Sequence, residues 1–137
     1  MTNKAAGTYL FSKNTGKILL LFRSEACSDP NTWSIITGIV DEGESFEEAA
    51  KREIREELNY SENINLYKFT EDIGKYDFES YIAFVDDDIN FDIDLSENTQ
   101  AKWFSKQEFY ELDNKHWGFN AVLEDESSKI IFDSFLK

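Results

Sequence analysis

The feature that most constrains the fold is one long helical pattern in the first half of the chain. Ser45 and Glu48 have the spacing of a capping box, which predicts a helix that begins after Ser45 and continues through Leu58. Each residue advances the helix by about 100°, so its apolar side chains form one stripe. These are Phe46, Ala50, Ile54 and Leu58. Such a stripe has to be buried, so this helix must pack on another element.

Three carboxylates lie beside the apolar stripe. On the same wheel Glu53, Glu56 and Glu57 fall at roughly 340°, 280° and 20° from Phe46, which projects Glu57 toward the buried side. Carboxylates that share a face repel one another unless a cation lies among them. Hard oxygen ligands of this kind suit Mg²⁺ or Mn²⁺. The pattern therefore predicts a divalent-metal site, and the alternative is a solvated acidic face with ordinary surface ion pairs.

Strand-like and helical patterns are intermixed along the rest of the chain. Strands are predicted at Thr8–Ser12, Ile18–Arg23, Ile64–Glu71, Glu79–Val85 and Ala101–Phe104. Shorter helices are predicted after Ser105 and over Trp117–Leu123 and Lys129–Leu136. Because βα units do not alternate regularly, this order favours an α+β fold or a sandwich with a mixed sheet. The length of 137 residues predicts a single domain over residues 1–137.

The charge balance limits the partners of the chain. Asp and Glu number 28 against 14 Lys and Arg, which gives a formal net charge of −14 at pH 7. A field of this sign repels polyanions, so we expect no nucleic-acid and no membrane partner. A small phosphorylated ligand would need divalent cations to supply positive charge. One cysteine, no signal-peptide core in Met1–Ala6 and no long apolar run predict a cytoplasmic location.

The segment Gly38–Tyr60 closely resembles a known family motif, the Nudix box. The resemblance is carried by Gly38, Glu44 and the run Arg52–Glu57, at the spacings of the box. Asn59 stands where the box has a glycine that ends the helix in a left-handed conformation. Asparagine is the next-best residue for that conformation, so this departure is mild. The chain is identified on these residues as similar to the Nudix hydrolase family.

The resemblance implies a fold, a reaction and a set of site residues. The implied fold is α/β (α+β), an α/β/α sandwich with a mixed β-sheet. The implied reaction is metal-dependent hydrolysis of a nucleoside diphosphate linked to a variable group X, which gives a nucleoside monophosphate and phosphorylated X. Mg²⁺ or Mn²⁺ would be held by Gly38 (through its carbonyl), Glu53, Glu56 and Glu57. Arg52 would orient a neighbouring carboxylate, and Glu44 would anchor the loop before the helix.

The general base and the substrate stay open at this stage. Glu53 is one candidate base, and Glu97, in a later loop, is the other. A dinucleoside polyphosphate and a nucleoside triphosphate, modified or not, are the two candidate substrates. Candidate substrate-binding residues are Arg23, Trp33, Tyr76, Phe119 and Asn120. The expected partner is therefore a small nucleotide, and the expected state is a monomer or a homodimer.

Two functions outside this enzyme class also fit parts of the sequence. One is a catalytically inactive Nudix-fold module that binds nucleotides or regulates another protein. The other is a calcium-binding protein, because Asp86–Glu97 has carboxylates near the positions of an EF-hand loop. Phe91 occupies the position where that loop requires glycine, which argues against calcium binding.

Overall fold

Strands form the frame of the molecule in the computed structural model. The backbone of residues 3–73 and 76–137 is described, with the side chains of residues 3–70 and 77–137. The strands are β1 (Asn3–Ser12), β2 (Ile18–Arg23), β3 (Trp33–Ser34), β4 (Ile36–Ile39), β5 (Tyr67–Ile73), β6 (Tyr76–Val85) and β7 (Asn98–Phe104). They form one mixed sheet with the path β3-β2-β1-β6-β5, in which β4 also pairs with β1 and β7 with β2.

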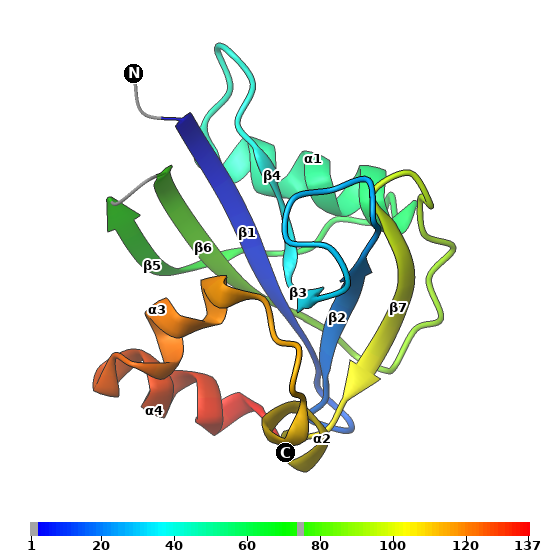
Figure 1. Ribbon diagram of the computed structural model, residues 1–137, viewed down its shortest axis with the longest axis vertical. Coiled ribbons are helices and arrows are strands. Elements are labelled where there is room, and N and C mark those ends of the chain that lie inside the picture. The colour runs from blue at the N-terminus through cyan, green and yellow to red at the C-terminus, as the bar shows by residue number, and fades with distance from the viewer. Residues whose placement is uncertain (1–2, 74–75) are drawn as a thin grey trace.

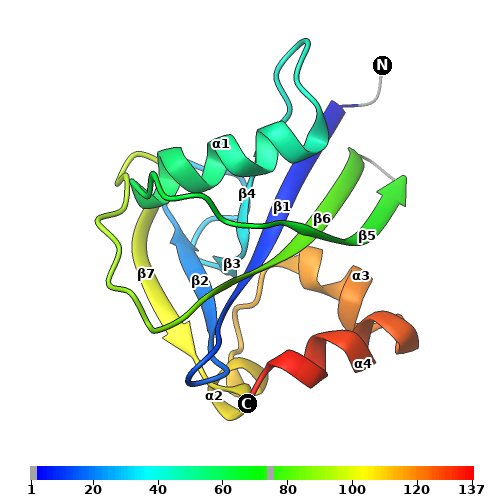
Figure 2. The same ribbon diagram turned by 180° about the vertical axis from the view of Figure 1, so that it is seen from behind.

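Helices cover both faces of this sheet. They are α1 (Phe46–Leu58), α2 (Lys106–Glu111), the 3₁₀ turn η1 (Trp117–Phe119), α3 (Asn120–Leu123) and α4 (Glu126–Phe135). The two opposite views show α1 on one side of the sheet and α3 and α4 on the other (Figures 1 and 2). Mixed α+β architecture in this layered form confirms the predicted α/β/α sandwich.

Alternation along β1 explains why both faces are covered. Tyr9 and Phe11 pack in the cluster that includes Phe132 of α4, whereas Leu10 packs in the cluster that includes Ile54 of α1. Successive side chains of a strand point to opposite faces, so the residues of this central strand from Ala5 onward reach one core or the other. Most of the strand is buried on both sides as a result.

The β1–β2 hairpin opens into a fork, and this fork creates the space for a site. β1 and β2 are paired only near their turn, at Phe11 and Ile18. Farther along, β1 pairs instead with β4, from Ala5 to Thr8. β4 and the short β3 therefore lie in the opening between β1 and β2 (Figure 1).

Local signals at the helix ends are confirmed. Ser45 and Glu48 form both hydrogen bonds of a capping box, and Ser105 and Glu108 form both bonds of a second one at α2. Asn59 ends α1 with φ of 50° and ψ of 41°, the left-handed conformation expected at the glycine position of the motif.

Two predictions need correction. The single helix predicted over Trp117–Leu123 is a 3₁₀ turn followed by the four-residue helix α3. His116 accepts a hydrogen bond from the Gly118 N–H and so begins the tighter turn. The predicted strand Ile64–Glu71 is β5, which begins later, at Tyr67.

The acidic segment Asp86–Glu97 does not have the surroundings of an EF-hand. It follows β6 and precedes β7, where an EF-hand has helices on both sides. Asp87 and Asp88 accept hydrogen bonds from Asn14 and Thr15 in the β1–β2 turn. The Phe91 ring packs against Tyr60 and Trp103. A bulky, packed side chain thus occupies the position where a calcium loop requires glycine. The calcium-binding alternative is therefore not supported by the fold.

Candidate active site

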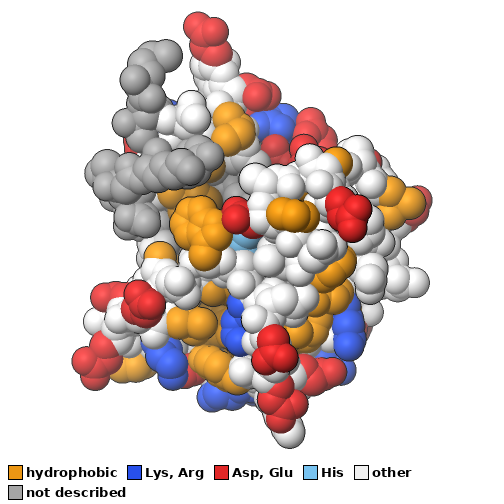
Figure 3. All heavy atoms as spheres, in the orientation of Figure 1, with side chains coloured by type: hydrophobic (Ala, Val, Ile, Leu, Met, Phe, Trp, Pro, Cys, Tyr) orange, Lys and Arg blue, Asp and Glu red, His pale blue; other side chains and the backbone are white. Residues whose placement is uncertain are grey.

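A cleft of about 1290 Å³ lies at the fork, between α1, the loops that follow β2 and precede β7, and the η1–α3 segment. It brings together residues that are far apart in the sequence. Among the predicted site residues, it is lined by Arg23, Gly38, Arg52, Glu53, Glu56, Glu57, Glu97, Phe119 and Asn120. Acidic side chains surround the face seen in Figure 3, and hydrophobic ones reach the surface between them.

Arg52 organises the carboxylates of α1. Its guanidinium has five N–H groups, and all five donate hydrogen bonds. Two go to Glu44, one to Glu53 at 2.9 Å, one to Glu56 at 3.1 Å and one to the Ile39 carbonyl. The Arg52 side chain is 19% exposed, and these carboxylates raise its pKa above the ordinary value. Arg52 therefore connects the helix to the end of β4 through these hydrogen bonds.

Glu44, in the loop before α1, holds the Arg52 side chain in place. Its Oε2 accepts from Arg52 Nε at 2.8 Å, and its Oε1 accepts from Arg52 Nη2 and from the Asp41 N–H at 3.0 Å each. These bonds lower the pKa of Glu44. The geometry agrees with the anchoring role that the motif implies.

Gly38 and Glu53 are in such close contact that a side chain at position 38 would displace the Glu53 carboxylate. A Cβ at Gly38 would overlap Oε1 and Cδ of Glu53. The Glu53 side chain is 11% exposed and is held by Arg52 on its other side. The absence of a side chain at Gly38 therefore gives the carboxylate its place beside the β4 backbone.

Glu57 lies deepest among the carboxylates of α1. The residue is 7% exposed, and its Oε2 atom has no hydrogen-bond partner within the part of the chain that is described. Burial raises the pKa of Glu57 to about 9, with the nearby charges of Glu53 and Glu97 adding to the effect. Burial likewise raises the pKa of Glu53, to about 7, against the opposing effect of Arg52.

These observations fit a divalent cation as the missing partner. An orphaned buried carboxylate oxygen, with two further carboxylates close enough to shift its pKa, is costly unless a cation compensates it. In the arrangement described, no group of three His, Cys, Asp or Glu side chains is yet placed to hold an ion. Glu53 and Glu56 are instead hydrogen-bonded to Arg52. The Glu56 side chain is 58% exposed, so it has room to turn from Arg52 toward a metal.

Two predicted site residues are not placed in the cleft. Trp33 lies in the core, where its ring centroid is 4.9 Å from those of both Phe22 and Phe104, so its assignment to the substrate site is corrected. The pairing of Phe22 with Trp33 in β2 and β3 turns both rings to that core. Tyr76 belongs to β6, but its side chain lies outside the described residues.

Other residues of the cleft were not predicted. Asn98 is 5% exposed at the start of β7, and its amide partly opposes the rise that burial causes in the pKa of Glu57. Its position directly after Glu97 is a signal that could have been followed. Tyr9 has no comparable local signal, because nothing near it in the sequence distinguishes it from a core aromatic.

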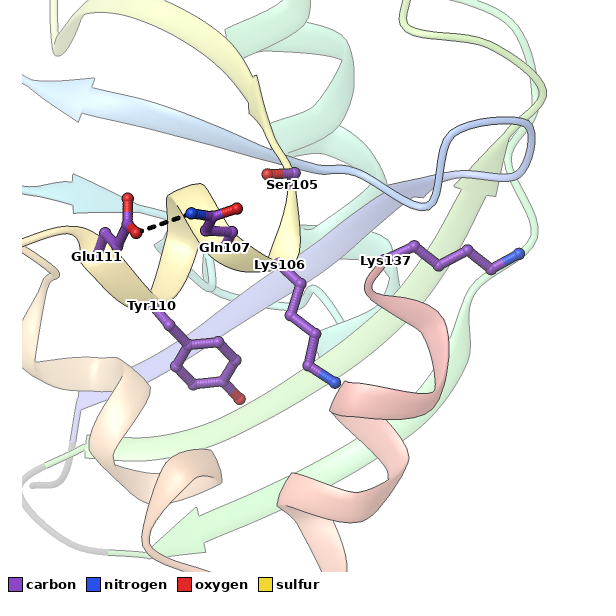
Figure 4. A pocket seen from close by; sticks show the side chains of 6 residues that line it. All are labelled: Ser105, Lys106, Gln107, Tyr110, Glu111 and Lys137. Carbon is purple, nitrogen blue, oxygen red and sulfur yellow. Dashed lines mark hydrogen bonds between the residues drawn. The ribbon is translucent and has the colours of Figure 1, made fainter.

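A second, shallower hollow of about 650 Å³ lies beside α2 and the C-terminal residue. In Figure 4 the Gln107 amide is bonded to Glu111, and the two lysines, Lys106 and Lys137, point in different directions. Because these groups do not converge on one point, the hollow is not a candidate active site.

The raised pKa values predict how the metal-free protein responds to pH. A carboxyl group with a raised pKa stabilises the fold fully below its ordinary pKa of 4.5, and this contribution is lost as pH rises to 7 for Glu53 and 9 for Glu57. In EDTA, we expect the melting temperature to fall from pH 5 to pH 9. Glu57→Gln should flatten this fall. At pH 8 its free energy of unfolding should exceed that of the parent by ~2 kcal/mol. Parallel pH profiles for the two proteins would contradict the assignment.

Comparisons with known proteins give one consistent family. A family model described as NUDIX domain matches residues 1–125. Nudix hydrolase 7 of Arabidopsis thaliana is 31% identical over 111 residues, which cover 76% of this chain and 39% of that protein. Dihydroneopterin triphosphate diphosphatase of Escherichia coli K12 is 39% identical over 49 residues, which cover 36% of this chain and 31% of that protein. The matches thus span well under half of the length of these two relatives.

Solved structures share the fold at low sequence identity. A Nudix hydrolase from M. smegmatis has a TM-score of 0.76 at 20% identity, covering 96% of this chain and 86% of that one. A C. elegans Ap4A hydrolase has a TM-score of 0.68 at 24% identity, covering 96% and 97%. The E. coli dihydroneopterin triphosphate pyrophosphohydrolase has a TM-score of 0.64 at 18% identity, covering 99% and 98%.

Proposed function

The chain belongs to the NUDIX domain family, and we propose that it is a divalent-metal-dependent pyrophosphohydrolase. The substrate is a nucleoside diphosphate linked to a group X, and the products are a nucleoside monophosphate and phosphorylated X. The observation that carries the proposal is one cleft lined by Gly38, Glu53, Glu56 and Glu57, in which the Glu53 carboxylate lies beside Gly38. A chain with a net charge of −14 needs cations in that cleft to accept a diphosphate.

The residues of the cleft have separate roles in this proposal. Glu53, Glu56, Glu57 and the Gly38 carbonyl would hold Mg²⁺ or Mn²⁺. When bound, such ions neutralise the diphosphate and lower the pKa of a water molecule. Arg52, fixed by Glu44, positions the Glu53 carboxylate beside Gly38. One P–O bond of the diphosphate breaks as water oxygen attacks phosphorus, and the water proton passes to a carboxylate base.

Glu53 and Glu97 remain the two candidates for this base. Glu53 is held rigidly by Arg52 at 2.9 Å, which suits a positioned group. Glu97 is exposed in the loop before β7, yet its charge reaches both Glu53 and Glu57. An exposed base on a loop can exchange protons with solvent, which favours turnover.

Two substrate classes are proposed for this cleft. They are dinucleoside polyphosphates and nucleoside triphosphates, modified or not. One relative is named for Ap4A, a dinucleoside polyphosphate, and others are named for dihydroneopterin triphosphate, a pterin triphosphate. Arg23, Phe119 and Asn120 line the cleft and are proposed to contact the substrate.

The part of the chain that is described contains no helix long and apolar enough to cross a membrane. A small nucleotide, bound by a monomer or a homodimer in the cytoplasm, is the partner that we propose.

The proposal is tested by product analysis across substrate classes with controlled metal. The panel contains dinucleoside polyphosphates, nucleoside triphosphates, dihydroneopterin triphosphate, ADP-ribose and nucleotide sugars. We expect hydrolysis of at least one member with Mg²⁺ or Mn²⁺, loss of turnover in EDTA, and recovery when either metal is restored. Full activity without a divalent ion would overturn the mechanism, and inactivity toward the whole panel would favour the binding-module alternative.

A further inference from the structure

The loop between β2 and β3, residues 24–31, lies along one edge of the cleft. Residues 26–29 of this loop line the cleft directly. No residue of the loop is buried, so apolar packing does not hold it in place. Its position therefore depends on the hydrogen bonds that it makes to neighbouring segments.

Asp29 joins this loop to η1. Its Oδ2 accepts a hydrogen bond from Trp117 Nε1 at 2.8 Å, and His116 Nε2 lies 3.3 Å from the same oxygen. His116 Nδ1 accepts a hydrogen bond from the Gly118 N–H, so the proton of the neutral ring lies on Nε2, toward Asp29. The backbone of Asp29 is left-handed, with φ of 50°, which costs free energy in a residue other than glycine. The contacts with η1 offset this cost.

The other end of the same loop holds Glu97. The Glu97 carbonyl oxygen accepts hydrogen bonds from the Ser24 N–H at 2.9 Å and from the Cys27 thiol at 3.3 Å. Glu97 lies directly before β7, where the pairing with β2 has ended. Its charge helps to raise the pKa of both Glu53 and Glu57. The position of the loop therefore bears on the electrostatics of the carboxylates of α1.

We propose that Asp29 is a positioning residue of the site, which fixes loop 24–31 through Trp117 and His116 so that the loop holds Glu97 close to the carboxylates of α1. This inference rests on the proposed function only in taking those carboxylates to bind a metal. An exposed loop with a strained backbone opens readily when such contacts are removed. Groups that orient a metal site from outside its ligands typically change the metal affinity by about tenfold or more.

The state of the loop can be measured without metal and without turnover. Cys27 is the one cysteine of the chain, so its rate of alkylation reports whether its thiol is held by the Glu97 carbonyl. We expect Asp29→Ala to speed alkylation about tenfold. Trp117→Phe removes the donor from the other side of the same bond and should have the same effect. Asp29→Asn keeps an acceptor and tolerates the left-handed conformation, so it should react at the parental rate.

Mn²⁺ binding, measured by isothermal titration calorimetry, tests whether the effect reaches the site through Glu97. We expect Asp29→Ala and Glu97→Gln each to weaken Mn²⁺ binding about tenfold. The double variant should bind no more weakly than Glu97→Gln alone, because both changes act on the same group. Asp29→Asn should bind Mn²⁺ as the parent does, since salt screens the exposed charge that it removes.

Asn31→Ala is the matched control for backbone strain. Asn31 is exposed in the same loop and has φ of 60°, so alanine there brings similar strain and leaves Asp29 in place. This variant should keep the parental alkylation rate and Mn²⁺ affinity.

Four results would each overturn the inference. They are parental alkylation in both Asp29→Ala and Trp117→Phe, equal effects of Asp29→Ala and its asparagine or Asn31→Ala counterparts, parental Mn²⁺ affinity in Glu97→Gln, and additive losses in the double variant. A parent protein that binds no Mn²⁺ but shows the expected alkylation pattern would instead overturn the proposed function alone.

Discussion

Replacing Glu57 by glutamine is expected to lower kcat by about 10³-fold or more, equivalent to about 4 kcal/mol. The change removes a ligand charge and keeps the shape of the side chain. Glu57 is 7% exposed in the cleft, and its Oε2 has no hydrogen-bond partner among the described residues, as we expect of a carboxylate that would bind a cation. Steady-state rates in saturating Mg²⁺ measure the effect.

Glu44→Gln is the matched control, because Glu44 is also a carboxylate of the motif but contacts Arg52 and the Asp41 backbone. Its loss should lower the melting temperature and affect the rate much less than the loss of Glu57. Near-parental rates in Glu57→Gln together with an inactive Glu44→Gln would show that the ligand assignment is wrong. A loss of metal-free stability in Glu57→Gln would support a structural role for that carboxyl group.

The second large effect is expected from Gly38→Ala, with a loss of kcat on the order of 10²-fold. The new methyl group would overlap the Glu53 carboxylate, which Arg52 holds from the other side. Glu53 must then leave its place, and a displacement of a reacting or ligating group by about 1 Å is enough for such a loss. Steady-state kinetics and metal affinity should both change.

Gly43→Ala provides the control for this substitution. Gly43 has φ of 81°, so alanine there is strained, but a Cβ would meet no atom within 4 Å. We expect about 1 kcal/mol of lost stability and a near-parental rate. Parental activity in Gly38→Ala would contradict the view that the contact with Glu53 is what requires glycine.

The features that the sequence determined by itself are those set by nearby residues. The capping box at Ser45, the left-handed end at Asn59 and the apolar stripe of α1 depend on contacts within about one turn of helix. The shared face of Glu53 and Glu57 has the same origin, and the Nudix motif that contains them is local too. For this reason helix α1, its carboxylates and the family could be derived before any tertiary contact was known.

Tertiary structure decided which distant groups complete the site. Glu97 and Asn98 reach Glu57 only because β7 pairs with β2 at the fork. Trp33 and Phe119 are both buried aromatics, yet strand pairing turns Trp33 into the core while Phe119 lines the cleft. Tyr9, on the central strand β1, lines the same cleft although nothing near it in the sequence indicates this. Strand register sets the face on which each side chain falls, and register depends on pairings between residues far apart in the chain.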